Sequence, residues 1–250
     1  MILKIDHIAF CSARFEADVQ RFESVGYTVQ FKEKGLRDLE NKRPFMREFS
    51  GELDMALLLR AGSIGIELLN HGHTIEEPSY VLPVLEGQAT AREPGGDTFS
   101  FNGSSFAQVS NGPENFFVDE NGANDFRCDK VVVEAEDIPT AARFWGRLGF
   151  KPLAVEERAA SLEFRSFLGG GTVRMFLRKS AGTAPRCWLD GYGFNCLAFF
   201  SSDAAKDRKH FTEFGMNPTE PNSFRVNGKD LRIYWVRGPA GEVAEVIGLP

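Results

Sequence analysis

The 250-residue sequence predicts an α+β protein made of tandem βαβββ units, one of them decayed. Two observations carry this prediction. A strand pattern followed by a helical pattern recurs at a constant spacing, and each recurrence continues into further strand patterns. The recurrence also restarts near the middle of the chain, because Lys130 − His7 = 123. A fixed internal period is the mark of a repeated structural unit.

The spacing links a residue in the first strand of each unit to a glycine after its helix. It is the same three times: Gly26 − His7 = 19, Gly149 − Lys130 = 19 and Gly215 − Cys196 = 19. An aromatic residue follows the first-strand residue at an offset of 15 in each case: Phe22, Trp145 and Phe211. Glycine readily adopts the left-handed turn that ends a helix. We therefore expect each helix to end at its glycine and its aromatic ring to pack on the sheet.

Strand pairs around glycine-rich turns complete three units. These units are expected at residues 1–70, 126–182 and 190–250. The restart near the midpoint then divides the chain into two halves, residues 1–125 and 126–250.

The stretch 71–125 differs from the three complete units. A short helix is expected over 78–86. Short strands are expected after it, at 98–101, 106–109 and 116–118. This order has two interpretations: a decayed fourth unit that has lost its first strand, or a long insertion of strand and turn pieces.

The composition excludes several classes of protein. The net charge of −6 is spread along the chain without a basic run, so we expect no nucleic-acid partner. No apolar run approaches the roughly 18 residues of a membrane span, and no signal-peptide pattern is seen, so we expect no membrane partner. The cysteines lack CxxC spacing, which is typical of reduced thiols in a cytoplasmic protein. They are Cys11, Cys128, Cys187 and Cys196.

At four places the sequence resembles the vicinal oxygen chelate superfamily, which includes glyoxalase I, methylmalonyl-CoA epimerase, extradiol dioxygenases and fosfomycin or bleomycin resistance proteins. These places are Ile5-Asp6-His7-Ile8-Ala9-Phe10, the helix end at 22–27, the strand at 65–69 and the stretch 237–247. The resemblance implies a glyoxalase-like fold, in which βαβββ units pair and their mixed sheets curl into a cup. It does not imply one reaction, because this fold supports several chemistries.

The resemblance also implies where metal ligands lie. In the family, a His or Gln comes from the first strand of a unit and a Glu from its last strand. His7 and Glu67 match this pattern in the first unit, and Glu245 matches in the last unit. Cys196 stands where the last unit's histidine is expected, and is either a small core residue or a thiolate ligand. An imidazole with carboxylates suits a divalent transition metal with open positions, among Fe, Mn, Ni, Co and Zn.

The unit at 126–182, which is the third along the chain when 71–125 is counted, departs from the family pattern. Lys130 takes the histidine position and Phe176 falls near the glutamate position. This counts against a ring-cleaving dioxygenase, which would hold its iron in the second half. Lys130 is either a substrate-anion contact or a surface lysine, and Tyr234 and Trp235 are either cavity aromatics or core residues. The candidate cavity residues are therefore Lys130, Cys196, Tyr234 and Trp235.

A second histidine pair follows the strand that carries Glu67. His71 and His73 are two residues apart, so on an extended chain both rings lie on one face. They are either metal ligands or part of a polar loop.

Among the chemistries of the family, our leading hypothesis is a metal-dependent isomerase or lyase acting on a small oxygenated or carbonyl substrate. The metal would act as a Lewis acid that stabilises an enediolate, and Glu67 or Glu245 would move the proton. The alternative is a metal-free protein of the same fold that binds an aromatic or drug-like ligand. A homodimer is also suggested, because units exchange between protomers in the family and the third unit lacks an intact partner.

Overall fold

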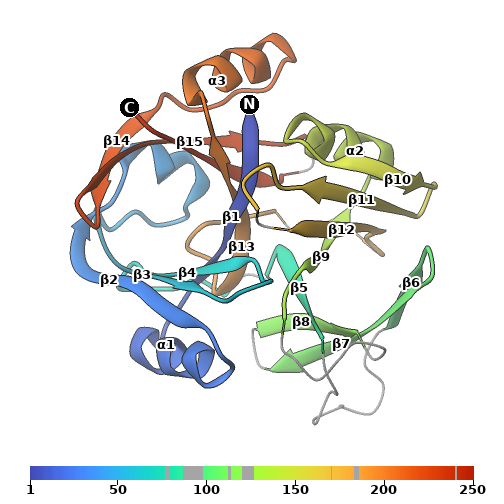
Figure 1. Cartoon of the computed structure of the whole chain (residues 1–250), viewed down its shortest axis with the longest axis horizontal. Helices are drawn as coiled ribbons and strands as arrows, with labels where there is room; N and C mark the ends of the chain where they lie inside the picture. Colours follow the sequence, from blue (N-terminus) through green and yellow to red (C-terminus); the bar gives the residue numbers. More distant parts are fainter. Residues whose placement is uncertain are drawn as a thin grey trace.

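The structure is a computed structural model in which two mixed sheets of eight strands each lie side by side (Figure 1). It describes residues 1–76, 79–86, 98–111, 114–119, 127–169, 171–182, 186–239 and 241–250. Both sheets repeat one plan, in which the first strand of a unit runs parallel to the last strand of that unit. No helix in these ranges is long and apolar enough to cross a membrane. The predicted glyoxalase-like α+β fold is confirmed.

The first sheet joins the first and last units of the chain. Its strand order is β14-β15-β16-β13-β1-β4-β3-β2. The strands are β1 (Ile2–Cys11), β2 (Thr28–Arg37), β3 (Glu52–Leu59), β4 (Gly65–Asn70), β13 (Gly193–Ser201), β14 (Asn222–Val226), β15 (Lys229–Arg237) and β16 (Val243–Gly248). At the centre of the sheet β1 runs antiparallel to β13, with His7 opposite Ala198. This pairing brings together two units at opposite ends of the sequence.

The second sheet is built from the middle of the chain in the same way. Its strand order is β10-β11-β12-β9-β5-β8-β7-β6. The strands are β5 (Val81–Glu86), β6 (Thr98–Phe101), β7 (Ser104–Asn111), β8 (Glu114–Asp119), β9 (Lys130–Ala135), β10 (Lys151–Val155), β11 (Ala159–Arg165) and β12 (Thr172–Lys179). Here β5 and β9 form the antiparallel pair at the centre. Each sheet thus takes strands from both predicted halves of the chain, and the division at residues 125 and 126 stays a prediction.

Three ten-residue helices follow the first strands of three units: α1 (Phe15–Ser24), α2 (Ile138–Arg147) and α3 (Ala204–Glu213). Asp137 and Asp203 begin α2 and α3, since each carboxylate accepts a hydrogen bond from a backbone N–H in the first turn. After the helices come the glycines with positive φ, at +91°, +101° and +75°: Gly26, Gly149 and Gly215. The expected helix ends are confirmed, and all three offset aromatics are buried.

The helix expected over 78–86 is wrong. Within this range the structure has strand β5, which pairs with β8 on one side and β9 on the other. Val81 and Val84 are fully buried, because a central strand needs apolar side chains on both faces. Such a short apolar run cannot be told from a buried helix by its period alone.

The three short strands expected after this segment are confirmed as parts of β6, β7 and β8. Under the decayed-unit interpretation, the first strand of 71–125 was expected to be lost, and strand β5 takes its place. We infer that 71–125 is a fourth unit rather than an insertion, because β5 holds the place in the second sheet that β1 holds in the first. Residues 87–97, between β5 and β6, lie outside the described ranges.

The two sheets share an apolar core at strand β13. The ring of Phe199 lies 6.2 to 6.5 Å from three rings of the third unit: Trp145, Phe150 and Phe164. Every unit finds its partner within this chain, so the expected reason for a dimer, a unit without a partner, does not apply. The homodimer stays a prediction.

Candidate active site

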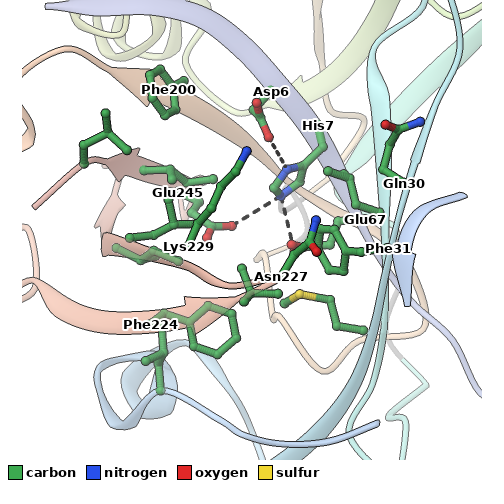
Figure 2. A pocket seen from close by; sticks show the side chains of 18 of the residues that line it. Asp6, His7, Gln30, Phe31, Glu67, Phe200, Phe224, Asn227, Lys229 and Glu245 are labelled. Carbon is green, nitrogen blue, oxygen red and sulfur yellow. Dashed lines mark hydrogen bonds and ion pairs between the residues drawn. The ribbon is translucent and has the colours of Figure 1, made fainter. Parts of the chain in front are cut away.

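The site lies in the first sheet, where β1, β4 and β16 bring His7, Glu67 and Glu245 together (Figure 2). Strand register explains the convergence. His7 pairs with Ala198, which pairs on its other side with Glu245. Two residues along β1, Ala9 pairs with Glu67. Because alternate residues of a strand face the same way, the two carboxylates flank the imidazole from its two neighbouring sides.

The three side chains meet through single atoms. Nε2 of His7 lies 3.3 Å from Oε2 of Glu67 and 3.6 Å from Oε2 of Glu245. All three candidate ligand atoms lie within 4.8 Å of one another. Nε2 of His7 is shielded from solvent and has no partner in hydrogen-bond geometry among the described residues. The imidazole therefore presents its second nitrogen to the space between two carboxylates.

Asp6 fixes the orientation of this imidazole. Its Oδ2 lies 3.1 Å from Nδ1 of His7 and forms a hydrogen bond with it. Lys4 holds the other oxygen of Asp6, with Nζ 2.5 Å from Oδ1. A carboxylate on the far nitrogen of a histidine sets its tautomer and makes the near nitrogen a better metal ligand. Asp6 was missed as a functional residue, although its place directly before His7 was visible.

The charges of the site are strongly coupled. Burial alone would lower the pKa of His7, but the charge of Glu67 and the hydrogen bond with Asp6 hold that pKa well above its usual value. Burial raises the pKa of Glu67, but the charge and hydrogen bond of His7 and the charge of Lys42 together outweigh burial and leave the pKa below its usual value. Burial raises the pKa of Glu245, and His7 only partly offsets that rise. Glu245 is thus the weaker acid of the two.

These residues fit a divalent metal ion. The donor set is one imidazole nitrogen and two carboxylates, and the unpartnered Nε2 of His7 is the atom that an ion would bind. Two carboxylates would also balance the charge of such an ion. Cys196 does not join the group. Burial, followed by the nearby charge of Glu245, raises the pKa of its thiol well above the usual value, so it is a neutral core thiol.

A lysine that the sequence did not single out also faces the site. Lys42 belongs to the short 3-10 helix η1 (Glu40–Phe45), which the Asn41 side chain holds across β15 through the carbonyl of Ile233. The Lys42 side chain is buried, and its Nζ lies 3.1 Å from Oδ1 of Asp38. Burial opposes its charge, but Asp38 and the site carboxylates raise the pKa of Lys42 above its usual value. No periodic pattern marks a lysine in an irregular segment, so sequence reasoning missed it.

The expected histidine pair separates into two carboxylate contacts. His71 is buried, with Nδ1 3.1 Å from Oδ2 of Asp38, so it supports the carboxylate that holds Lys42. Nε2 of His73 lies 3.5 Å from Oδ2 of Asp190. Neither ring belongs to the three-residue ligand group.

A cavity of about 410 Å³ opens over the three ligand residues. Most of its walls are apolar: Phe31, Leu39, Met55, Leu57, Leu59, Phe200, Phe224, Val226, Leu231, Ile233, Trp235, Ile247 and Leu249. Figure 2 shows Phe31, Phe200 and Phe224 around the ligand residues, with Gln30, Asn227 and Lys229 as the polar side chains of the same walls. The cavity therefore suits a molecule with an oxygen-bearing end and an apolar body.

The four candidate cavity residues have different places. Trp235 lines the cavity beside Glu245, its register partner on the neighbouring strand β16. Tyr234, its neighbour on β15, is buried but is not among the lining residues, as the alternation of strand side chains requires. Cys196 is buried below the site. Lys130 lies in the second sheet, where its Nζ is 2.9 Å from Oδ2 of Asp119.

Comparison with known proteins supports the fold. No protein-family model and no curated protein matches the sequence. A solved structure of a provisionally assigned dioxygenase from Bacillus subtilis is 10% identical, with a TM-score of 0.67 over 100% of this chain and 86% of that chain. Glyoxalase I from Zea mays is 12% identical, with a TM-score of 0.64 over 98% of this chain and 92% of the maize chain. The chain therefore has the fold of glyoxalase I.

Proposed function

We propose that the protein is a divalent-metal-dependent isomerase or lyase of the vicinal oxygen chelate type, acting on a small carbonyl or oxygenated substrate. One observation carries the proposal. His7, Glu67 and Glu245 bring three ligand atoms within 4.8 Å of one another at the floor of an apolar cavity. Buried charged groups are costly unless they are paired or bind a metal, so such a group inside a cavity points to a functional role.

The site residues would have different roles in this reaction. His7 and the two carboxylates would hold the ion, and Asp6 orients His7 through Nδ1. A divalent ion at this place supplies Lewis acidity toward two adjacent oxygens of a substrate. Glu245 would accept and return a proton through a carboxylate oxygen that does not hold the ion. Trp235 and Phe200 exclude water from that proton.

The walls of the cavity indicate the class of substrate. Thirteen apolar side chains line it, so the substrate should carry an apolar body of small size. Lys42 places a positive charge near the carboxylates, and Asp38 holds that charge in position. We therefore infer that an oxyanion or carboxylate of the substrate lies toward Lys42.

The alternative is a metal-free ligand-binding protein, and one observation favours it. In the absence of an ion, a protonated His7 between Glu67 and Glu245 neutralises one of the two carboxylate charges. The apolar cavity would then hold an aromatic ligand through burial alone.

Metal analysis of protein purified without chelator separates the two functions. We expect about one Ni, Co, Mn, Fe or Zn ion per chain for the wild type and for His210→Ala, which changes an exposed histidine of α3. We expect little metal in His7→Ala. Equally little metal in all three proteins would contradict the metal-dependent function and leave the binding function.

A bidentate probe tests the substrate class. Benzohydroxamic acid carries two adjacent oxygens and an apolar ring, whereas acetohydroxamic acid lacks the ring. We expect calorimetry to show that the first binds only metal-loaded wild type, and roughly tenfold or more tighter than the second, because several ring CH groups are buried. Equal affinities would remove the apolar substrate from the proposal without affecting the metal site.

A further inference from the structure

A second hollow lies between α2 and the segment that follows α3. Its volume is about 730 Å³, and no described residue lines both it and the active-site cavity. Four arginines line it: Arg143 and Arg147 of α2, Arg186, and Arg237 at the end of β15. We call these four residues and the hollow between them the arginine groove. It joins helix α2, of the unit at 126–182, to loops of the last unit, at 190–250.

Neutral groups hold these arginines in place. No aspartate or glutamate is among the described residues that line the groove, and none of the four guanidinium groups has a described carboxylate within 4.0 Å. Nη2 of Arg143 donates to Oγ1 of Thr140 at 2.7 Å. The guanidinium of Arg147 lies over the ring of Phe214, 3.4 Å from its centre. The positive charges of the groove are thus positioned mainly by neutral groups, and only the buried Glu242 carboxylate acts on Arg237, from beyond ion-pair distance, among the described residues.

Arg237 is the most enclosed of the four. Its Nη1 donates to the carbonyls of Cys187 at 3.3 Å and Gly241 at 3.2 Å. Its Nη2 is shielded from solvent and has no hydrogen-bond partner among the described residues. Burial lowers the pKa of Arg237, and the charge of Arg186 lowers it further. The guanidinium is therefore oriented by two hydrogen bonds, and its Nη2 has a donor that no described residue uses.

Such a cluster is unfavourable by itself. Arg143 and Arg147 are four residues apart on one helix, where like charges repel. Arg186 and Arg237 add two more charges, although the whole chain carries a net charge of −6. Each guanidinium offers a planar fork that matches the oxygens of a phosphate. An anion with several charges would relieve the repulsion and complete the hydrogen bonds.

We infer that the arginine groove is a second ligand site, which binds a small molecule with at least two phosphate charges. Phe144, Phe214 and Met216 form an apolar wall beside the arginines, so the ligand should also carry an apolar or aromatic part. A nucleoside diphosphate has both features. This inference does not rest on the metal site.

Calorimetry with inorganic pyrophosphate in low-salt buffer tests the site. We expect one pyrophosphate to bind per chain, and binding to weaken at least tenfold in Arg143→Gln/Arg147→Gln, because two charge-assisted contacts are lost. Both side chains are exposed, so this variant should fold. The matched control is Lys151→Gln/Arg158→Gln, which removes two exposed charges from the second sheet and should bind like wild type.

Binding measurements with a second variant and a second ligand complete the test. His7→Ala should bind pyrophosphate like wild type, which separates the groove from phosphate binding at a metal. Adenosine diphosphate should bind more tightly than pyrophosphate if the apolar wall takes part. No binding to wild type, or equal binding by the groove variant and the control, would overturn the site. Loss of binding in His7→Ala would assign it to the cavity instead.

Discussion

The two sheets have the same strand order and register, but they carry opposite chemistry at equivalent positions. When the two sheets are aligned by the register of their central antiparallel pairs, β1 with β13 and β5 with β9, four residue positions of the first sheet match four of the second. In the first sheet these positions hold His7, Glu67, Cys196 and Glu245. In the second sheet they hold Leu82, Phe117, Lys130 and Phe176. One backbone plan thus serves a charged cavity in one place and an apolar core in the other.

Packing explains why the second sheet holds no such site at these positions. The ring of Phe176 lies 4.8 Å from that of Phe106 and 6.4 Å from that of Phe99. Together with Leu82 and Phe117 these rings fill the space that is a cavity in the first sheet. Lys130 keeps its charge only by turning to Asp119. The comparison shows that both sheets have the backbone positions for such a site, and that side-chain volume decides which sheet has a cavity there.

Placing the first sheet's chemistry in the second should have the largest effect. Phe176→Glu removes a ring from the aromatic cluster and buries a carboxylate without a partner. We expect the free energy of unfolding to fall by about 4 kcal/mol, as measured by urea denaturation. Phe176→Leu is the control and should cost less, roughly 2 kcal/mol, because it adds no charge. Equal losses for both variants would show that the second sheet tolerates a charge.

Removing a ligand from the first sheet should come next. Glu245→Gln keeps the volume but loses the charge that would hold the ion. We expect metal affinity by calorimetry to fall about 100-fold or more, since even residues outside the ligand set cost 10- to 100-fold. Glu213→Gln, which changes an exposed glutamate of α3, is the matched control. Unchanged affinity in Glu245→Gln would exclude Glu245 from the ligand set.

Proton competition should make metal binding depend on pH. The pKa of His7 is raised in the metal-free protein. Its imidazolium therefore stabilises the folded protein fully below pH 6.5, and this contribution is lost as the pH rises through the raised pKa. An ion must displace that proton. Metal affinity should therefore increase with pH, by up to about tenfold per unit while His7 is protonated. Titrations in two buffers of different ionisation enthalpy count the released proton, and no release would contradict the assignment of Nε2.

The smallest effect should come from the residue behind the histidine. Asp6→Asn keeps a hydrogen-bond acceptor near Nδ1 but removes its charge. We expect a loss of metal affinity of about tenfold, measured as above. Asp230→Asn, on an exposed end of β15, should leave the affinity unchanged. A loss as large as that of Glu245→Gln would show that Asp6 itself binds the ion.

Much of the fold was predictable because it rests on local signals. The glycine after each helix and the aromatic before it recur because each unit must turn and pack in the same way. His7, Glu67 and Glu245 could be named in advance as candidate ligands because the family resemblance assigns ligands to the first and last strands of a unit. Strand β5 was mistaken for a helix because its short apolar run has no period of its own, and only its two neighbouring strands define it.

The rest depended on contacts between distant segments. No local pattern states that the first unit pairs with the last, or that Lys42 from an irregular segment reaches the carboxylates. The arginine groove likewise joins residues of two units that are far apart in sequence. The sequence by itself determined the repeated unit, because its spacing recurs along the chain, and the family resemblance named the three candidate ligand residues. Only the tertiary structure decided which sheet keeps an open cavity, because that depends on which side chains fill the space between paired units.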